Sequence, residues 1–164
     1  MIDFVREYAS YNYWSNQKIC SVAEKLSYEQ IHREIASSFP SIQKTLLHMW
    51  DAQSIWISRV EGVSLKEFPS AHFSGTRVDV VKGLLFTSQK LKEIANEIEN
   101  SSLHDFIEFS TMKGVRMKSE LYQIFSHVFN HGTYHRGQLV TMFRQVGVTE
   151  IPNTDLISFY REMK

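Results

Sequence analysis

The chain has 164 residues, of which 43% are hydrophobic and 13% aromatic, a composition typical of a folded globular domain. Its 18 basic and 18 acidic residues give a formal net charge of zero and form no basic block, which argues against nucleic-acid binding. No apolar run approaches the roughly 20 residues that span a bilayer, and one cysteine, Cys20, excludes an internal disulfide. Residues 1–7 are charged and lack the apolar core of a secretory signal. We therefore expect a single cytoplasmic domain over residues 1–164, with no membrane and no nucleic-acid partner.

Apolar residues recur at helical spacing in four stretches of the chain. The predicted long helices cover residues 3–26, 41–61, 78–99 and 118–147. The polar Asn12 interrupts the apolar stripe of the first, and Ser41 and Gly62 are the expected start and stop of the second. A cap at Thr154 is expected to begin a short last helix. Four long helices in one domain predict an all-α fold, a four-helix bundle.

The segment between the third and fourth helices has a different period. Residues 106–111 and 115–118 alternate apolar and polar side chains on either side of Lys113 and Gly114. Such alternation around a glycine turn predicts a small β-hairpin before the last long helix.

The fourth helix contains two histidines, His131 and His135, on one face. They continue an apolar stripe and so stand where core residues are expected; the stripe is Leu121, Ile124, Val128, His131, His135, Leu139, Met142 and Val146. Burying two unpaired imidazoles costs roughly 1–3 kcal/mol each, a cost that a shared cation removes. The pattern predicts a metal site. The alternatives are two surface histidines or a histidine-rich core without metal.

A firmly held ion needs at least one more protein ligand. His48, in the middle of the second helix, can point into the bundle from a facing helix, or it can be a partly buried histidine bonded to a neighbour. His127 diverges from His135 by roughly 80° around the helix, so we expect it to pack nearby or support a ligand. The histidines expected to be solvated in turns or loops are His32, His72 and His104.

Two glycines lie inside the fourth helix, Gly132 and Gly137. Each destabilises a helix by roughly 1 kcal/mol relative to alanine, which indicates either the close approach of a ligand or backbone, or only tight helix contact. Asp51, one turn after His48, is the nearest acid that could orient a ligand. Cys20 lies beside the apolar stripe of the first helix with no activating partner, so we expect a buried structural thiol.

Three groups of residues together resemble the DinB family: residues 11–14, residues 45–48 with Trp56, and the specific motif Asn130–Gln138. The likeness covers nearly the whole chain. It implies an up-down-down-up four-helix bundle, usually a homodimer, that binds a divalent ion, zinc or nickel, through three histidines. His131 and His135 match the family's pair and His48 its ligand on the second helix, and Asn12 is expected near the site by analogy.

The resemblance implies more about the metal than about the reaction. Some relatives in the wider superfamily look like transferases or isomerases that add a low-molecular-weight thiol to an electrophile, and others have been called hydrolases. We therefore expect a metal-dependent enzyme of the thiol-dependent S-transferase or hydrolase type acting on a small-molecule substrate, with the thiol as co-substrate. The alternative is a non-catalytic, metal-stabilised binding or stress-response module.

Overall fold

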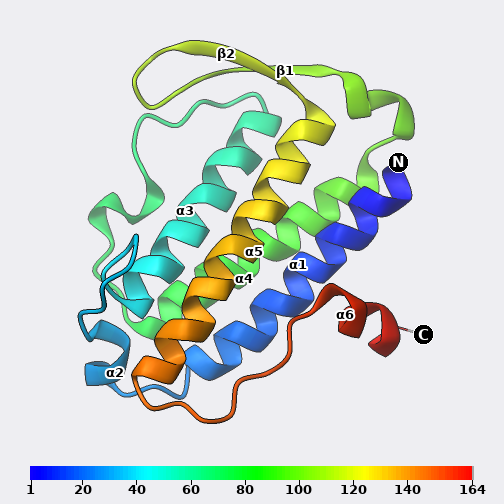
Figure 1. Ribbon diagram of the computed structural model, residues 1–164. Coiled ribbons are helices and arrows are strands. Elements are labelled where there is room, and N and C mark those ends of the chain that lie inside the picture. The colour runs from blue at the N-terminus through cyan, green and yellow to red at the C-terminus, as the bar shows by residue number, and fades with distance from the viewer. Residues whose placement is uncertain (164) are drawn as a thin grey trace.

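Four long helices form the body of the computed structural model, which describes residues 1–163 (Figure 1). They are α1 (Ile2–Ala23), α3 (Ile42–Val60), α4 (Arg77–Glu97) and α5 (Leu121–Gln145). In Figure 1, α1 and α5 run one way and α3 and α4 the other, which is the up-down-down-up order. Each helix packs against two neighbours, α1 and α3 both contacting α4 and α5. The all-α bundle predicted from the sequence is confirmed.

Short elements connect and flank these helices. They are α2 (Tyr28–His32), two 3₁₀ turns at Pro69–His72 and Asn100–His104, the strands β1 (Phe106–Ser110) and β2 (Arg116–Glu120), and α6 (Leu156–Glu162). The two strands pair antiparallel, with Phe106 opposite Glu120, around a turn that places Gly114 at a φ of 77°. The predicted hairpin is therefore present, and it lies across one end of the bundle (Figure 1).

Several predicted boundaries were wrong, and a capping interaction explains two of these differences. The first helix ends at Ala23 rather than Leu26, since Ser27 begins a separate capping box with Gln30. Residues 118–120 belong to β2, so α5 begins only at Leu121, where Glu120 and Gln123 form its capping box. The last helix is preceded by Asp155, not Thr154.

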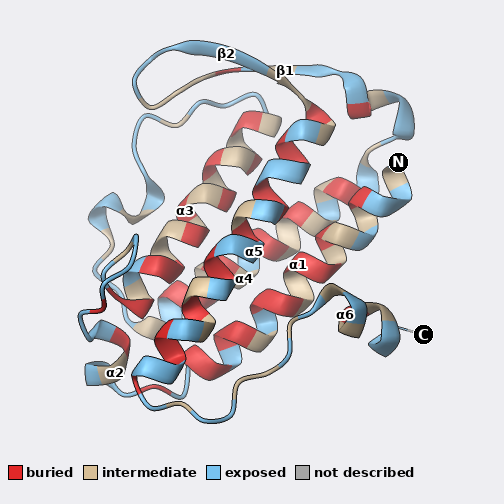
Figure 2. Ribbon diagram, viewed as in Figure 1, coloured by how far each residue is buried: buried red, intermediate tan, exposed pale blue. Residues whose placement is uncertain are grey.

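The buried residues face the inside of the bundle (Figure 2), and the apolar ones form two clusters, one toward each end. One cluster includes Ile19, Leu46 and Phe143, and the other includes Leu91 and Phe125. All of these side chains are buried, which supplies the main driving force for packing the four helices. Cys20 belongs to the first cluster, and burial raises the pKa of its thiol to about 12, as expected for a structural cysteine.

Polar side chains from all four long helices form a buried polar layer. Arg136 of α5 donates to Asn16 of α1, and the Asn16 amide donates to Ser88 of α4. Ser88 and Thr87 both donate to the Gln53 side chain of α3, at 3.0 and 2.8 Å. Because buried polar groups must find partners, this chain of hydrogen bonds fixes the helices relative to one another.

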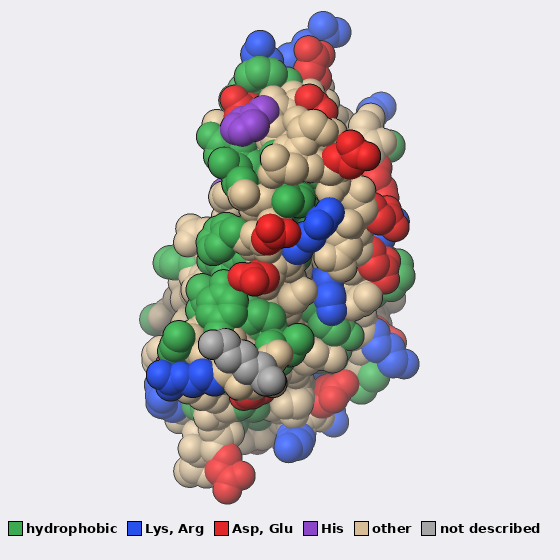
Figure 3. Space-filling model, turned by 90° about the vertical axis from the view of Figure 1, so that its right-hand side faces the viewer, with side chains coloured by type: hydrophobic (Ala, Val, Ile, Leu, Met, Phe, Trp, Pro, Cys, Tyr) green, Lys and Arg blue, Asp and Glu red, His purple; other side chains and the backbone are tan. Residues whose placement is uncertain are grey.

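The outer surface is mixed in character. Figure 3, which views the side of the molecule that carries α6, shows hydrophobic patches interrupted by acidic and basic side chains. Among residues 1–163, no helix combines the length and the apolar character needed to cross a membrane.

Candidate metal centre

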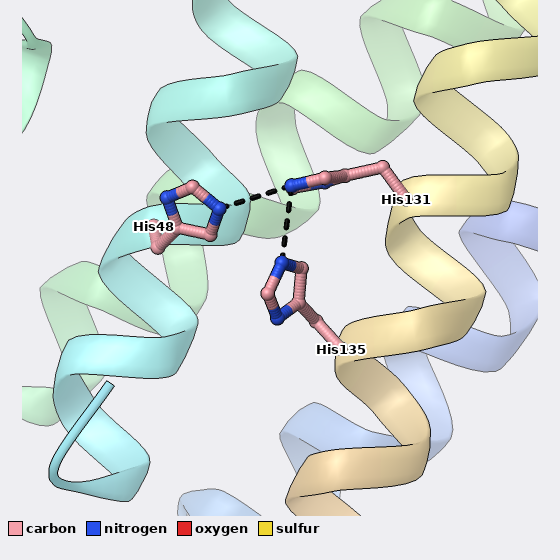
Figure 4. A group of neighbouring side chains, drawn as sticks. All are labelled: His48, His131 and His135. Atoms are coloured by element: carbon pink, nitrogen blue, oxygen red, sulfur yellow. Dashed lines mark hydrogen bonds between the residues drawn. The ribbon is translucent and has the colours of Figure 1, made fainter. Parts of the chain in front are cut away.

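The three histidines predicted as ligands lie together between α3 and α5 (Figure 4). His131 Nε2 lies 2.9 Å from His48 Nε2 and 3.0 Å from His135 Nε2. The three ligand atoms all lie within 4.8 Å of one another. Nitrogens that share a tetrahedral zinc ion at 2.0–2.1 Å are about 3.3 Å apart, so the spacing fits a single ion of that size.

Antiparallel packing of α3 against α5 creates this convergence. His131 and His135 are one turn apart on the face of α5 that points toward α3, and His48 points back from α3 (Figure 4). The loop before α3 contributes Phe39, whose ring stacks on His48 with centroids 4.0 Å apart. The stacked ring holds the His48 imidazole in place and covers one of its faces.

The two Nε2–Nε2 contacts of His131 cannot both be hydrogen bonds between neutral rings. His135 Nδ1 lies 2.7 Å from the side-chain oxygen of Gln138, which can only accept, so Nδ1 carries the proton and Nε2 a lone pair. The His131 Nε2 position can hold at most one proton and can donate to only one neighbour. In its contact with the other histidine, two nitrogens then face each other with no proton between them. An ion that accepts three lone pairs resolves this conflict.

Protonating the rings is also unfavourable. Burial, together with charge on the neighbouring rings, lowers the pKa of His48 to about 4 and that of His131 to about 3. Burial likewise lowers the pKa of His135. The rings are thus neutral, as a metal ligand must be, throughout the physiological pH range.

These lowered pKa values predict a pH-dependent stability for the ion-free protein. In the unfolded chain histidine titrates near ~6.5, so below that pH the unfolded state takes up protons that the folded state does not. The free energy of unfolding should therefore be at its full value above about pH 6.5 and should fall as the pH drops toward about 4. Denaturant unfolding of the ion-free protein at about pH 7.5 and about pH 5 measures this loss. A His131→Gln variant should show a smaller loss, and an unchanged pH dependence in that variant would contradict the assignment.

Gln138 orients the imidazole of His135, and the expectation that Asp51 would orient a histidine of the cluster was wrong. The amide nitrogen of Gln138 donates to Ser38 at 3.0 Å and to Tyr134 at 3.2 Å, which turns its oxygen toward His135. Asp51 instead accepts from the backbone and hydroxyl of Ser70, in the 3₁₀ turn after α3. Asp51 therefore anchors the segment that follows α3. The side-chain amide of Gln138, rather than a carboxylate, supports a histidine of the cluster.

The remaining histidines lie outside the cluster, as expected. His127 packs against Trp56, with ring centroids 5.2 Å apart, and its ring centroid is 5.9 Å from that of His131. The exposed histidines each bond locally: His32 to the backbone of Tyr28, His72 to Glu67 and His104 to Glu120.

The two glycines inside α5 differ in the space around them. A Cβ atom at Gly132 would lie 2.8 Å from Asn12 Oδ1 and 2.9 Å from Arg136 Nη1, so the missing side chain makes room for the polar layer. A Cβ atom at Gly137 would meet nothing within 4 Å. Asn12 accepts from Arg136 at 2.9 Å, so it supports the residue after His135.

Sequence reasoning missed two residues of the site, Gln138 and Phe39. The spacing of Gln138, three residues after His135, places both on one face of a helix and was a usable signal. Nothing in the pattern around Phe39 indicates that its loop folds back over the second helix.

Residues 1–162 match the sequence model described as the DinB family. The chain is also similar to Protein DinB of Bacillus subtilis (strain 168), with 30% identity over 158 residues, which cover 93% of this chain and 91% of that protein.

Proposed function

The chain belongs to the DinB family, and from that premise we propose that it is a metal-dependent enzyme whose His48, His131 and His135 hold one divalent ion, zinc or nickel. The observation that carries the proposal is the meeting of three Nε2 atoms whose mutual hydrogen bonds cannot all be made. Imidazole nitrogen suits both metals. Three protein ligands also leave coordination positions open, which is the pattern of catalytic rather than structural sites.

We favour a thiol-dependent S-transferase that uses a low-molecular-weight thiol over a hydrolase. When bound, a divalent ion supplies Lewis-acid chemistry that lowers the pKa of a water or thiol in contact with it. Three neutral imidazoles leave the positive charge of the ion uncompensated, which favours an anion, a thiolate or a hydroxide, as the next ligand. A hydrolase would be expected to place a carboxylate base nearby, and Asp51 is bonded to Ser70 instead.

The chain's own residues form a hollow close to the group that orients His135. A cavity of about 340 Å³ is lined by Ser37, Tyr134 and Gln138 among others, and Gln138 is the hydrogen-bond partner of His135. Phe39 shields the His48 ring from solvent on one face, and the exposed Tyr134 places a hydroxyl at the cavity wall. A small-molecule electrophile entering here would lie against Tyr134 and Gln138, one residue removed from the histidines.

Turnover by the metal-loaded protein tests this proposal. We expect consumption of an electrophilic aryl halide together with a low-molecular-weight thiol, lost in His135→Ala. A panel of esters, assayed in parallel, tests hydrolysis. Full metal occupancy with no turnover on either panel would overturn the enzyme assignment in favour of a non-catalytic, metal-stabilised module. A protein that binds no metal would overturn both.

The supporting bond from Gln138 gives a further prediction. Gln138→Leu removes the acceptor of the His135 Nδ1 proton and is expected to weaken zinc binding roughly 10–100-fold. Gln138→Glu keeps an acceptor and should retain most of the affinity. Competition titration with a chromogenic chelator measures both. Equal affinity in Gln138→Leu and the unaltered protein would show that the hydrogen bond does not support the ligand.

A homodimer and a cytoplasmic location are proposed on the family resemblance. Phe86 in α4 is 71% exposed, the kind of apolar side chain that a second copy would cover. Sedimentation equilibrium of the unaltered protein and of Phe86→Ser tests the dimer.

A further inference from the structure

Arg136 is a buried cation without a counter-ion. Its side chain is 2% exposed, and within residues 1–163 it forms no ion pair with a carboxylate. Its partners are neutral: Nη1 donates to Asn12 and Asn16 at 2.9 and 3.0 Å, and Nη2 donates to Thr133 at 2.8 Å. Nε has no hydrogen-bond partner. A buried charge that is left unneutralised is strongly unfavourable, so a positive group in this position calls for an anion.

A cavity of about 690 Å³ leads to this residue from the side of α5 away from the histidines. Its walls are α1, α5 and the segment at residues 151–156, which runs back along α1 in Figure 1. On α5, Arg136, Val140 and Arg144 line it at four-residue spacing, which extends about 12 Å along the helix. The cavity thus extends from Arg136, which is almost fully buried, to a second arginine, Arg144, which is exposed.

The wall opposite α5 is held in place by specific contacts. The Tyr11 hydroxyl donates to the Thr154 carbonyl at 2.8 Å, and Phe159 packs edge-on against Tyr11 and Trp14. Glu162 then accepts from Trp14 and forms an ion pair with Lys18, both at 2.9 Å. The cavity is therefore a built feature of the fold rather than a gap beside a loose tail.

The lining has the chemistry of an organic-anion site. Two arginines face a single acid, Asp155, and the phenol rings of Tyr8 and Tyr11 lie on the α1 side. Val140, Ile151 and Leu156 provide apolar surface between these polar groups. A charge in such a partly enclosed, low-dielectric setting acts on an anion more strongly than it does in water.

We propose that this cavity binds a small organic anion, a carboxylate or phosphate monoester, with its anionic group toward Arg136 and its apolar body against Val140, Ile151 and Leu156. Arg144 attracts the ligand at the outer end. The site is separate from the three histidines, because Arg136 points toward α1 whereas His131 and His135 point toward α3 (Figure 4). The proposal does not depend on the metal-dependent activity.

Binding of phenyl phosphate and of benzoate to the unaltered protein as purified tests the proposal, with neutral benzyl alcohol as the matched probe. We expect saturable shifts in the methyl resonances of Val140, Ile151 and Leu156 with both anions. Benzyl alcohol should bind at least roughly tenfold more weakly. Shifts confined to Leu47 and Ala52, which flank His48, would mean that the anions bind at the histidines instead, and would overturn the proposal.

Two variants identify the charge that acts. Arg136→Met is expected to weaken phenyl phosphate at least roughly tenfold, and Arg144→Gln by roughly two- to fivefold with a reduced salt dependence. Arg161→Gln removes the same charge from an exposed position in α6 and should leave binding unchanged. If Arg136→Met fails to fold, the comparison of Arg144→Gln with Arg161→Gln still tests the proposal. Equal affinity of Arg144→Gln and Arg161→Gln for phenyl phosphate would overturn it, and so would the absence of a saturable shift in the unaltered protein.

Discussion

Replacing His131 with alanine is expected to lower the affinity for zinc and nickel by more than about a hundredfold, since loss of a direct ligand should exceed the 10–100-fold effect of a supporting group. His131 is the central member of the cluster, with its Nε2 atom 2.9 and 3.0 Å from those of His48 and His135. Removing it leaves two imidazoles on different helices. Calorimetric titration and elemental analysis of the purified protein measure the change.

His127→Ala is the matched control for this experiment. It removes a histidine from the same helix, one turn earlier, whose ring packs on Trp56 rather than in the cluster. Metal affinity should be nearly unchanged in this variant. A His131→Ala protein that kept full occupancy, or a His127→Ala protein that lost it, would remove the basis of the metal assignment.

An ion held by His48, His131 and His135 would join α3 to α5, so we expect it to stabilise the fold. At a free concentration of a hundred times the dissociation constant, a ligand specific to the native state adds about 2.7 kcal/mol to the free energy of unfolding. Chelation is therefore expected to lower the unfolding midpoint of the unaltered protein and to have almost no effect on His131→Ala.

Gly132→Ala is expected to destabilise the protein by about 1–3 kcal/mol, although alanine is the better helix former. The added methyl group would lie 2.8 Å from Asn12 Oδ1 and 2.9 Å from Arg136 Nη1. Neither neighbour can move away easily, because both are buried and bonded to each other. Urea unfolding measures the change in free energy.

Gly137→Ala, five residues later in the same helix, should instead raise the free energy of unfolding. Its methyl group would meet nothing within 4 Å, so the variant should gain up to about 1 kcal/mol from helix propensity. Effects of equal sign in the two variants would show that close packing around Gly132 does not set its identity.

Much of the architecture follows from local patterns in the sequence. Helical periodicity located the four long helices, Ser41 correctly marked the start of α3, and alternation around Gly114 located the hairpin. The placement of His131 and His135 on one core-facing stripe also followed from their spacing, because both lie in a single helix whose geometry is fixed. Errors fell at boundaries such as residues 118–120, where a strand passes directly into a helix.

Only the tertiary structure decided which distant residues meet. Residue spacing alone left His48 either as a ligand or as a satisfied core histidine, and its convergence with His131 depends on how α3 packs against α5. The pairing of Asp51 with Ser70, and of Arg136 with Asn12 and Asn16, depends in the same way on contacts between separate elements. Periodicity specifies which face a side chain occupies, whereas its partner is set by the packing of segments far apart in the chain.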